Sequence, residues 1–311
     1  KERLWDKDSF VRSLSVKILG TLINSTHLDL SEIGSDFITK LNDVEWRVKL
    51  LTSKRIVKIL TENPSKIKKT DALIKSVVNN FREENEEIRE FAGKIFKLLG
   101  FSSIIPKEEF FELIQNLLKD NDWRVRETII DIIGEICNKY SSEIKDLIPQ
   151  LINLLGDHSH VIQSKTINSL IKIAKIHFDE VFSNLITKLD TDNIELRNNI
   201  EETLLYLAQE NIENISIYIL EELNNPLLKI RTTISRVLAN LYDENENDIE
   251  NEILKLFNKF ESKLWRKRKN LVNLLTDIAL ILKSEKIYVL IGSELKKKTF
   301  KRKRRRSKRR N

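Results

Sequence analysis

The sequence of 311 residues is poor in the residues that build loops, disulfide bridges and membrane spans. Its one cysteine, Cys137, cannot form an internal disulfide, and no secretory signal peptide is recognisable. No apolar run approaches the roughly 18 residues that a membrane helix needs. Seven glycines and four prolines leave little room for loops. These absences favour a helix-rich, intracellular protein. We expect it to be cytoplasmic, or nuclear if the host is a eukaryote.

One position recurs through the sequence with the same apolar frame around it. We call it the anchor, and it is basic in every copy except one, which has glutamine. The anchors are Arg12, Lys49, Arg89, Arg126, Gln163, Arg197, Arg231 and Arg268. Their spacings are 37, 40, 37, 37, 34, 34 and 37 residues. Such periods are typical of paired helices that stack into a solenoid.

The frame predicts two helices in each repeat. The residues eight before, seven after and ten after the anchor are apolar in all eight copies. The residue directly before the anchor is also apolar, except in the last repeat, where it is Lys267. Offsets of −1, +3, +7 and +10 fall on one face of a helix, so the repeat ends in an amphipathic helix. A second apolar stripe, at offsets −12 and −8, predicts a preceding helix. Offset −6 carries an acidic or small polar residue, which we expect to accept hydrogen bonds from free amides at the start of the second helix.

The pattern Asp120-Asn121-Asp122-Trp123-Arg124-Val125-Arg126 and its seven relatives resemble the HEAT-repeat family, whose units pair two helices across a turn with Asp, followed six residues later by Arg. The resemblance implies an all-α fold, a right-handed α-solenoid of about eight helix pairs over residues 1–283. A capping helix over 284–295 and a disordered basic tail over 296–311 are expected to follow. The chain lacks methionine and the −12 residue of its first repeat, so we expect that repeat to be truncated and the native protein to continue upstream.

The resemblance also implies a structural ladder between the turn residues and the anchors of neighbouring repeats. Gln163 cannot carry the charge of this ladder. The remaining ladder residues are Asp6, Arg12, Asp43, Lys49, Arg89, Asp120, Arg126, Asp157, Arg197, Arg231 and Arg268.

Positive charge is concentrated at the C-terminus. Residues 296–310 contain 12 basic and no acidic side chains: Lys296, Lys297, Lys298, Lys301, Arg302, Lys303, Arg304, Arg305, Arg306, Lys308, Arg309 and Arg310. The whole chain has a net charge of +7, whereas residues 1–295, with 42 basic and 47 acidic side chains, have −5. A block of like charge attracts a polyanion, and nucleic acid is the leading candidate. A nuclear-import signal, and contact with an anionic membrane or an acidic protein, remain alternatives.

A possible partner surface is predicted from helix phase. Offset +5 lies opposite the buried stripe, and the first three repeats have Lys17, Lys54 and Lys94 there. We expect an acidic segment of a protein partner to dock along this row, in the groove formed by the second helices; the alternative is an ordinary solvated row.

Other candidate sites are weaker. Trp46 and Trp123 stand three residues before their anchors, and their recurrence favours packing at the turn over base stacking. Two histidines, His158 and His160, are too few for a metal site, and Cys137 has the position of a small core residue. No Gly-rich phosphate loop is present, so neither a cofactor nor a small-molecule substrate is expected.

These patterns favour a non-enzymatic scaffold that binds a protein partner, with the tail tethering it to RNA or DNA. The alternative is an adaptor or transport-type HEAT protein whose tail is a localisation or anionic-surface signal. A third interpretation, a HEAT-like DNA glycosylase, is disfavoured because residues 1–295 are net negative.

Overall fold

The computed structural model describes residues 2–25, 30–210 and 227–244, with Glu222, Asn225, Val289 and Gly292. Within these residues all regular structure is helical, and they contain no strand. Two compact units divide the chain, Lys1–Ile176 and His177–Asn311. The all-α prediction is confirmed. The last repeat, the expected capping helix apart from Val289 and Gly292, and the basic tail lie outside the described residues.

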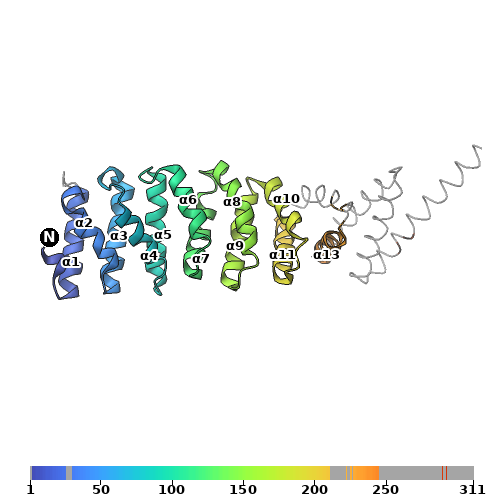
Figure 1. Ribbon diagram of the computed structural model, residues 1–311, viewed down its shortest axis with the longest axis horizontal. Coiled ribbons are helices and arrows are strands. Elements are labelled where there is room, and N and C mark those ends of the chain that lie inside the picture. The colour runs from blue at the N-terminus through green and yellow to red at the C-terminus, as the bar shows by residue number, and fades with distance from the viewer. Residues whose placement is uncertain are drawn as a thin grey trace, which may run out of the picture. The chain divides into compact units, whose positions relative to one another are not determined.

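The first unit is a stack of helix pairs. Its second helices are α1 (Ser9–Ser25), α3 (Trp46–Glu62), α5 (Glu86–Phe101), α7 (Trp123–Ile136) and α9 (His160–Ala174). Its first helices are α2 (Leu30–Thr39), α4 (Asp71–Asn80), α6 (Lys107–Leu117) and α8 (Ser141–Leu154), and short 3-10 turns span Glu2–Trp5, Lys40–Asn42 and Pro64–Lys66. Each second helix packs beside the next one in the order α1, α3, α5, α7, α9 (Figure 1). The second helices therefore form one layer of this unit.

The second unit is described over three helices. These are α10 (Phe178–Lys188), α11 (Ile194–Glu210) and α13 (Leu228–Glu244). Helix α11 contacts both α10 and α13, so the repeat order of first and second helices continues here.

The predicted apolar columns form the core. In the second repeat, Leu41, Val48, Ile56 and Ile59 are at most 1% exposed. The corresponding residues of the third to fifth repeats are buried in the same way, from Phe81 to Ile173. Burying one large apolar side chain contributes about 1.5 to 3 kcal/mol before conformational entropy is subtracted. Each helix pair is therefore held together mainly by contacts that the repeat pattern specifies.

The first repeat departs from this pattern. Val11 and Leu19, at offsets −1 and +7, are only partly buried, and Leu22, at offset +10, is 38% exposed. The same offsets are buried in the second repeat because its own first helix covers them. Helix α1 is preceded in the described chain only by the short turn Glu2–Trp5.

The side chain at offset −6 does not cap the second helix, as the sequence indicated, but accepts a hydrogen bond within the turn before it. Asp43 accepts a hydrogen bond from the amide of Glu45 at 3.0 Å, and Asp120 accepts one from the amide of Asp122 at 2.9 Å. Each bond closes a turn of the chain before the helix begins. The capping residue of α7 is Asp122 itself, which accepts a hydrogen bond from the amide of Arg124. The offset −6 side chain therefore shapes the turn that precedes the second helix.

Candidate functional site

The anchor of the first repeat joins two consecutive turns. Arg12 donates Nε and Nη2 to the two carboxylate oxygens of Asp43, at 2.9 and 2.7 Å. Its Nη1 donates to the backbone oxygens of Asp6 and Lys7, at 2.9 and 3.0 Å. Burial by itself would raise the pKa of Asp43, but the hydrogen bonds from Arg12 and the amide of Glu45 lower it below its ordinary value. The carboxylate is thus held ionised in a buried position.

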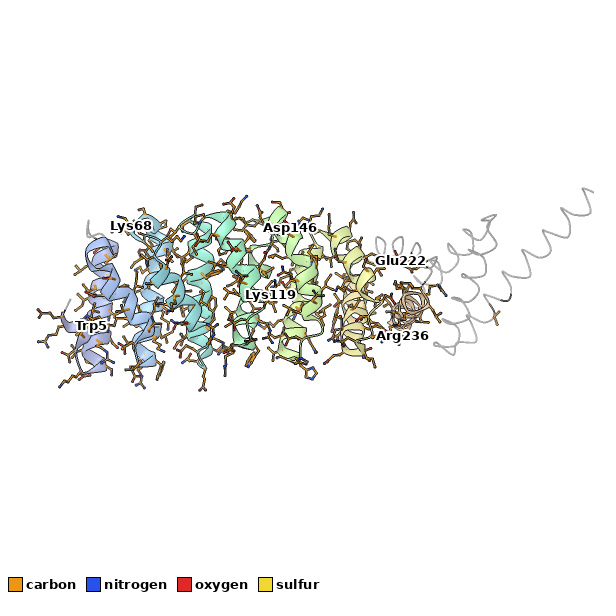
Figure 2. All side chains as sticks on the ribbon, viewed as in Figure 1. Trp5, Lys68, Lys119, Asp146, Glu222 and Arg236 are labelled. Carbon is orange, nitrogen blue, oxygen red and sulfur yellow. The ribbon has the colours of Figure 1, made fainter. Side chains whose placement is uncertain are left out.

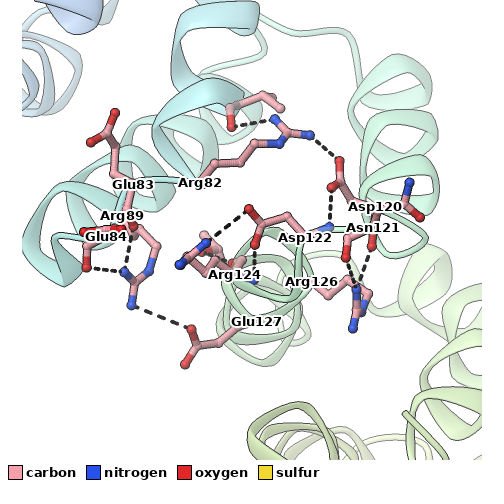
Figure 3. A network of polar contacts seen from close by, with 12 residues as sticks. Arg82, Glu83, Glu84, Arg89, Asp120, Asn121, Asp122, Arg124, Arg126 and Glu127 are labelled. Atoms are coloured by element: carbon pink, nitrogen blue, oxygen red, sulfur yellow. Dashed lines mark hydrogen bonds and ion pairs between the residues drawn. The ribbon is translucent and has the colours of Figure 1, made fainter. Parts of the chain in front are cut away.

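The fourth repeat has the same arrangement. Arg126 donates to the two carboxylate oxygens of Asp157 at 2.9 and 2.8 Å. It also donates to the backbone oxygens of Asp120 and Asn121 at 2.7 and 3.1 Å (Figure 3). Gln163 keeps the anchor's hydrogen bond to the turn of its own repeat, because its amide nitrogen donates to the backbone oxygen of Asp157 at 2.6 Å. A neutral amide is therefore sufficient to brace the turn of its own repeat.

The second step of the ladder uses the acid at offset −6 of the following repeat, whereas the third step uses a different acid. Lys49 contacts Glu83 at 2.5 Å. Arg89 donates to the backbone oxygens of Glu83 and Glu84, but its second Nη lies 3.9 Å from Glu127 and does not bind Asp120. Asp120 is paired with Arg82 instead (Figure 3). The geometry is that of a structural ladder, with partners that vary between steps.

The first ladder residue and those described in the second unit make hydrogen bonds within their own repeats or stand at helix starts. Asp6 accepts hydrogen bonds from Arg3 and from the amide of Asp8. In the second unit, Arg231 donates to the backbone oxygen of Asn225 at 2.7 Å, and Arg197 lies in the first turn of α11. Arg268 lies outside the described residues.

The three lysines at offset +5 do not form a uniform positive row. Lys54 pairs with Glu87 at 2.6 Å, and Lys94 pairs with Glu90 at the same distance, whereas Lys17 is exposed on α1. The ammonium groups of Lys54 and Lys94 also lie over the ring of Phe91, at 5.2 and 4.8 Å from its centre. An acidic segment docking here would have to displace two carboxylates of the protein itself.

A groove of about 350 Å³ lies on the outer surface of α5, α7 and α9. Gly93, Thr128 and Ile132 line it where α5 and α7 approach closely, since a Cβ on Gly93 would lie 3.3 Å from Cγ2 of Thr128. The charged lining residues are Glu86, Glu90, Glu127, Asp131, Glu135, Arg89, Lys94, Lys165 and Lys172. Both signs of charge are therefore presented to whatever enters the groove.

Ion pairs cross between the helices of this groove. Lys165 of α9 pairs with Asp131 of α7 at 2.8 Å, and Lys97 of α5 pairs with Glu135 of α7. Burial raises the pKa of Glu127, which Arg89 reaches only at 3.9 Å. For Glu127, burial therefore outweighs the attraction of Lys165 and Arg89.

The tryptophans of the turns are more exposed than the sequence suggested. Trp46 and Trp123 are 44% and 37% exposed at the first positions of α3 and α7. The guanidinium groups of Arg47 and Arg124 lie 5.0 and 5.4 Å from their ring centres. Trp5, at the α1 end of the first unit, is 59% exposed (Figure 2). Trp46 and Trp123 therefore stand at the turns as partly exposed rings, each with a neighbouring arginine over it.

Several other expectations have a plain structural outcome. Cys137 is buried in the core, and within the described residues no cluster of His, Cys, Asp and Glu has the arrangement of a metal site. The described helices include none that is long and apolar enough to cross a membrane. The 12 basic residues of the tail lie outside the described residues.

Residues 110–205 match the family model described as HEAT repeats. A search of curated proteins found no match. Among solved structures, the MAST/Orbit N-terminal domain has a TM-score of 0.58 at 17% identity, covering 68% of this chain and 96% of that domain. A structure from the work "Crescerin uses a TOG domain array to regulate microtubules in the primary cilium" has a TM-score of 0.51 at 18% identity, covering 68% and 88%.

The karyopherin Kap121p, bound to the extreme C-terminus of the protein phosphatase Cdc14p, has a TM-score of 0.54 at 13% identity. The match covers 94% of this chain and 34% of the karyopherin, so this chain spans about a third of that length. At such identities the likeness concerns the fold alone. Together with the family match and the repeated anchors, it shows that the chain contains HEAT repeats and has an α-solenoid fold.

Proposed function

We propose that this protein is a non-enzymatic scaffold that holds a segment of a protein partner in the groove of α5, α7 and α9. The observation that carries the proposal is the groove itself, about 350 Å³ in volume, with a floor of small and apolar residues and charged walls. Apolar contact provides affinity, and fixed charges around it select the orientation of a bound segment.

The walls indicate the chemistry of the bound segment. Five acidic and four basic side chains line the groove, and two pairs among them cross it, Asp131 with Lys165 and Arg89 with Glu127. A segment of a single sign would pair with the wall charges of opposite sign and leave those of its own sign without compensation, which is costly in a partly buried site. We therefore propose a partner segment that carries both acidic and basic residues around a small apolar centre. The karyopherin among the similar structures is bound to the extreme C-terminus of another protein, so its ligand is also a segment of a protein chain.

Photo-crosslinking tests this site. A photoreactive amino acid replaces Lys172 in the groove or, as a matched control, Glu112, an exposed residue of α6 on a first helix. After irradiation in an extract of the source organism, we expect a discrete adduct with the Lys172 variant and none with the Glu112 variant. Equal labelling from both positions would refute the groove as the binding surface.

We further propose that the basic tail tethers the scaffold to nucleic acid. Twelve positive charges that all neutralise phosphates would produce a slope of log K against log salt of roughly −8 to −11, and fewer contacts reduce it in proportion. Such binding follows backbone charge and not base sequence.

The test compares the full chain with residues 1–295 on mixed RNA and DNA duplexes across a salt series. Steep salt dependence that is lost on truncation supports the tether. Binding that survives truncation would move the site onto the repeats. No binding by either protein would leave an adaptor whose tail is a localisation or anionic-surface signal.

A further inference from the structure

The groove of α5, α7 and α9 has an excess of negative charge at its end near the turns. Three acids line this end, Glu86, Glu127 and Asp131. Lys165 pairs with Asp131 at 2.8 Å, but Arg89 approaches Glu127 only to 3.9 Å, which is too far for a hydrogen bond (Figure 3). Glu86 has no ion pair within the described part of the chain, and its charge adds to the burial that raises the pKa of Glu127. This end of the groove therefore has room for one more cation.

The other end of the groove has an excess of positive charge. Lys172 of α9 is exposed there, and none of the described residues forms an ion pair with it. Its side chain lies along α7, since a Cβ on Gly134 would lie 3.5 Å from Cδ of Lys172. Glu135, the acid of this end, pairs with Lys97 of α5. The remaining two charges of the lining pair with each other on α5, so Lys172 is left to receive a carboxylate from outside.

The distance between the two ends follows from the helices themselves. The two ion pairs that join α5 to α7 lie eight residues apart in both helices, so these helices run parallel and in register. Gly134, which Lys172 covers, stands seven residues after Glu127 on α7. At a rise of 1.5 Å per residue, the two charges are separated by about 10 Å along the axis of α7. The groove is therefore polar along its length, negative near the turns and positive about two helical turns further on.

The size of the groove indicates the conformation of its occupant. A helix with its side chains is about 10 Å wide, so a volume of about 350 Å³ holds less than one turn of it. An extended chain rises about 3.3 Å per residue, and every second side chain points to the same side. Side chains four positions apart therefore share one side and stand about 13 Å apart, and the flexible ends of long charged side chains bridge the difference of about 3 Å. Between them, Gly93 and the buried Ile132 form an apolar floor.

We propose that the groove binds an extended partner segment with a basic and an acidic residue four positions apart, the basic one at Glu127 and the acidic one at Lys172. The inference rests on the proposed function of the groove and adds the order and the spacing of the partner's charges. Arginine suits the basic position best, because its guanidinium can donate two hydrogen bonds to one carboxylate. The residue midway between the charges lies over Gly93 and is small and apolar. Binding also supplies Glu127 with the hydrogen bonds that it lacks in the free protein.

Selection against the full chain tests the inference, with random peptides of about 12 residues, which span about 40 Å when extended and so exceed the groove. We expect the selected peptides to carry the charge pair. Fluorescence anisotropy then measures their affinity for variants. Glu127→Gln should weaken binding about tenfold, because it removes a charge-assisted hydrogen bond from a partly buried site. Lys172→Gln, at an exposed position, should weaken it about threefold. The matched controls, Glu112→Gln and Lys119→Gln, alter exposed residues outside the groove and should change nothing.

Changes in the peptide show which charge meets which. The loss caused by Glu127→Gln should disappear when the basic residue of the peptide is replaced by glutamine, and the loss caused by Lys172→Gln when its acidic residue is replaced. Peptides that increase the protection of α7 amides from hydrogen exchange, but lack the charge pair or respond to neither variant, would overturn the inference and leave the groove as the binding surface. If no peptide is selected, or if the selected peptides leave those amides unchanged, the groove itself is refuted and the inference with it.

Discussion

Removing the carboxylate of Asp43 should destabilise the first unit more than a change at any exposed ion pair. Arg12 binds both oxygens of Asp43, and the two side chains are only 10% and 3% exposed. Loss of one partner from a buried pair costs about 3 to 5 kcal/mol, because the other charge stays buried without compensation. Arg12 keeps its two backbone acceptors in Asp43→Asn, so we expect a cost near the lower end, about 3 kcal/mol.

A double-mutant cycle separates the pair from its surroundings. Arg12→Gln imitates Gln163, which braces its own turn as a neutral amide. The double variant Arg12→Gln/Asp43→Asn has no buried charge from this pair, so we expect it to be more stable than the sum of the single changes predicts, by at least about 1 kcal/mol. Lys40, at 3.6 Å from Asp43, is left in all variants and cancels in the cycle.

The assay is hydrogen exchange of amides in α1 and α3, because a repeat array does not unfold as one unit and needs a local measurement. The pH dependence adds a second observable. The pKa of Asp43 is lowered on folding from its ordinary value of 3.8, so its contribution is present above that value and is lost as the pH falls through the lower, folded value. Additive effects in the cycle, or the same acid sensitivity in wild type and Asp43→Asn, would refute the argument.

Two further predictions concern helix packing and the groove. A Cβ at position 100 would lie 2.7 Å from the ring of Phe110, so Gly100→Ala should lower the free energy of local opening of α5 by about 2 to 3 kcal/mol. A Cβ at position 93 would lie 3.3 Å from Thr128, so Gly93→Ala should lower it by about 1 kcal/mol or less, and hydrogen exchange of the α5 amides measures both. Equal costs would contradict this distinction. Burial raises the pKa of Glu127, so its ionised form opposes folding at neutral pH, and that penalty disappears as the pH falls through the raised value. Glu127→Gln should therefore stabilise the fold slightly at neutral pH, by less than about 1 kcal/mol, and a clear loss of stability would show that its contact with Arg89 outweighs its burial.

The repeat pattern was sufficient to predict the helices and the core. Periodic apolar positions such as Leu41, Ile56 and Ile59 are buried in the second repeat as predicted, because amphipathic helices of one repeat can bury their stripes only against each other. The same reasoning identified the turn residue Asp43 and its anchor, whose geometry is local to two adjacent turns.

The choice of partners on the surface could not be predicted in this way. Arg89 lies near Glu127 and not Asp120, Lys54 is neutralised by Glu87, and Trp46 remains half open. These outcomes depend on the separation and rotation of neighbouring helices, which no single repeat encodes. The sequence by itself determined which residues each repeat buries, since that follows from helical periodicity. Only the tertiary structure decided where charges pair and where the groove opens, because those features arise where residues about 35 positions apart meet across the stack.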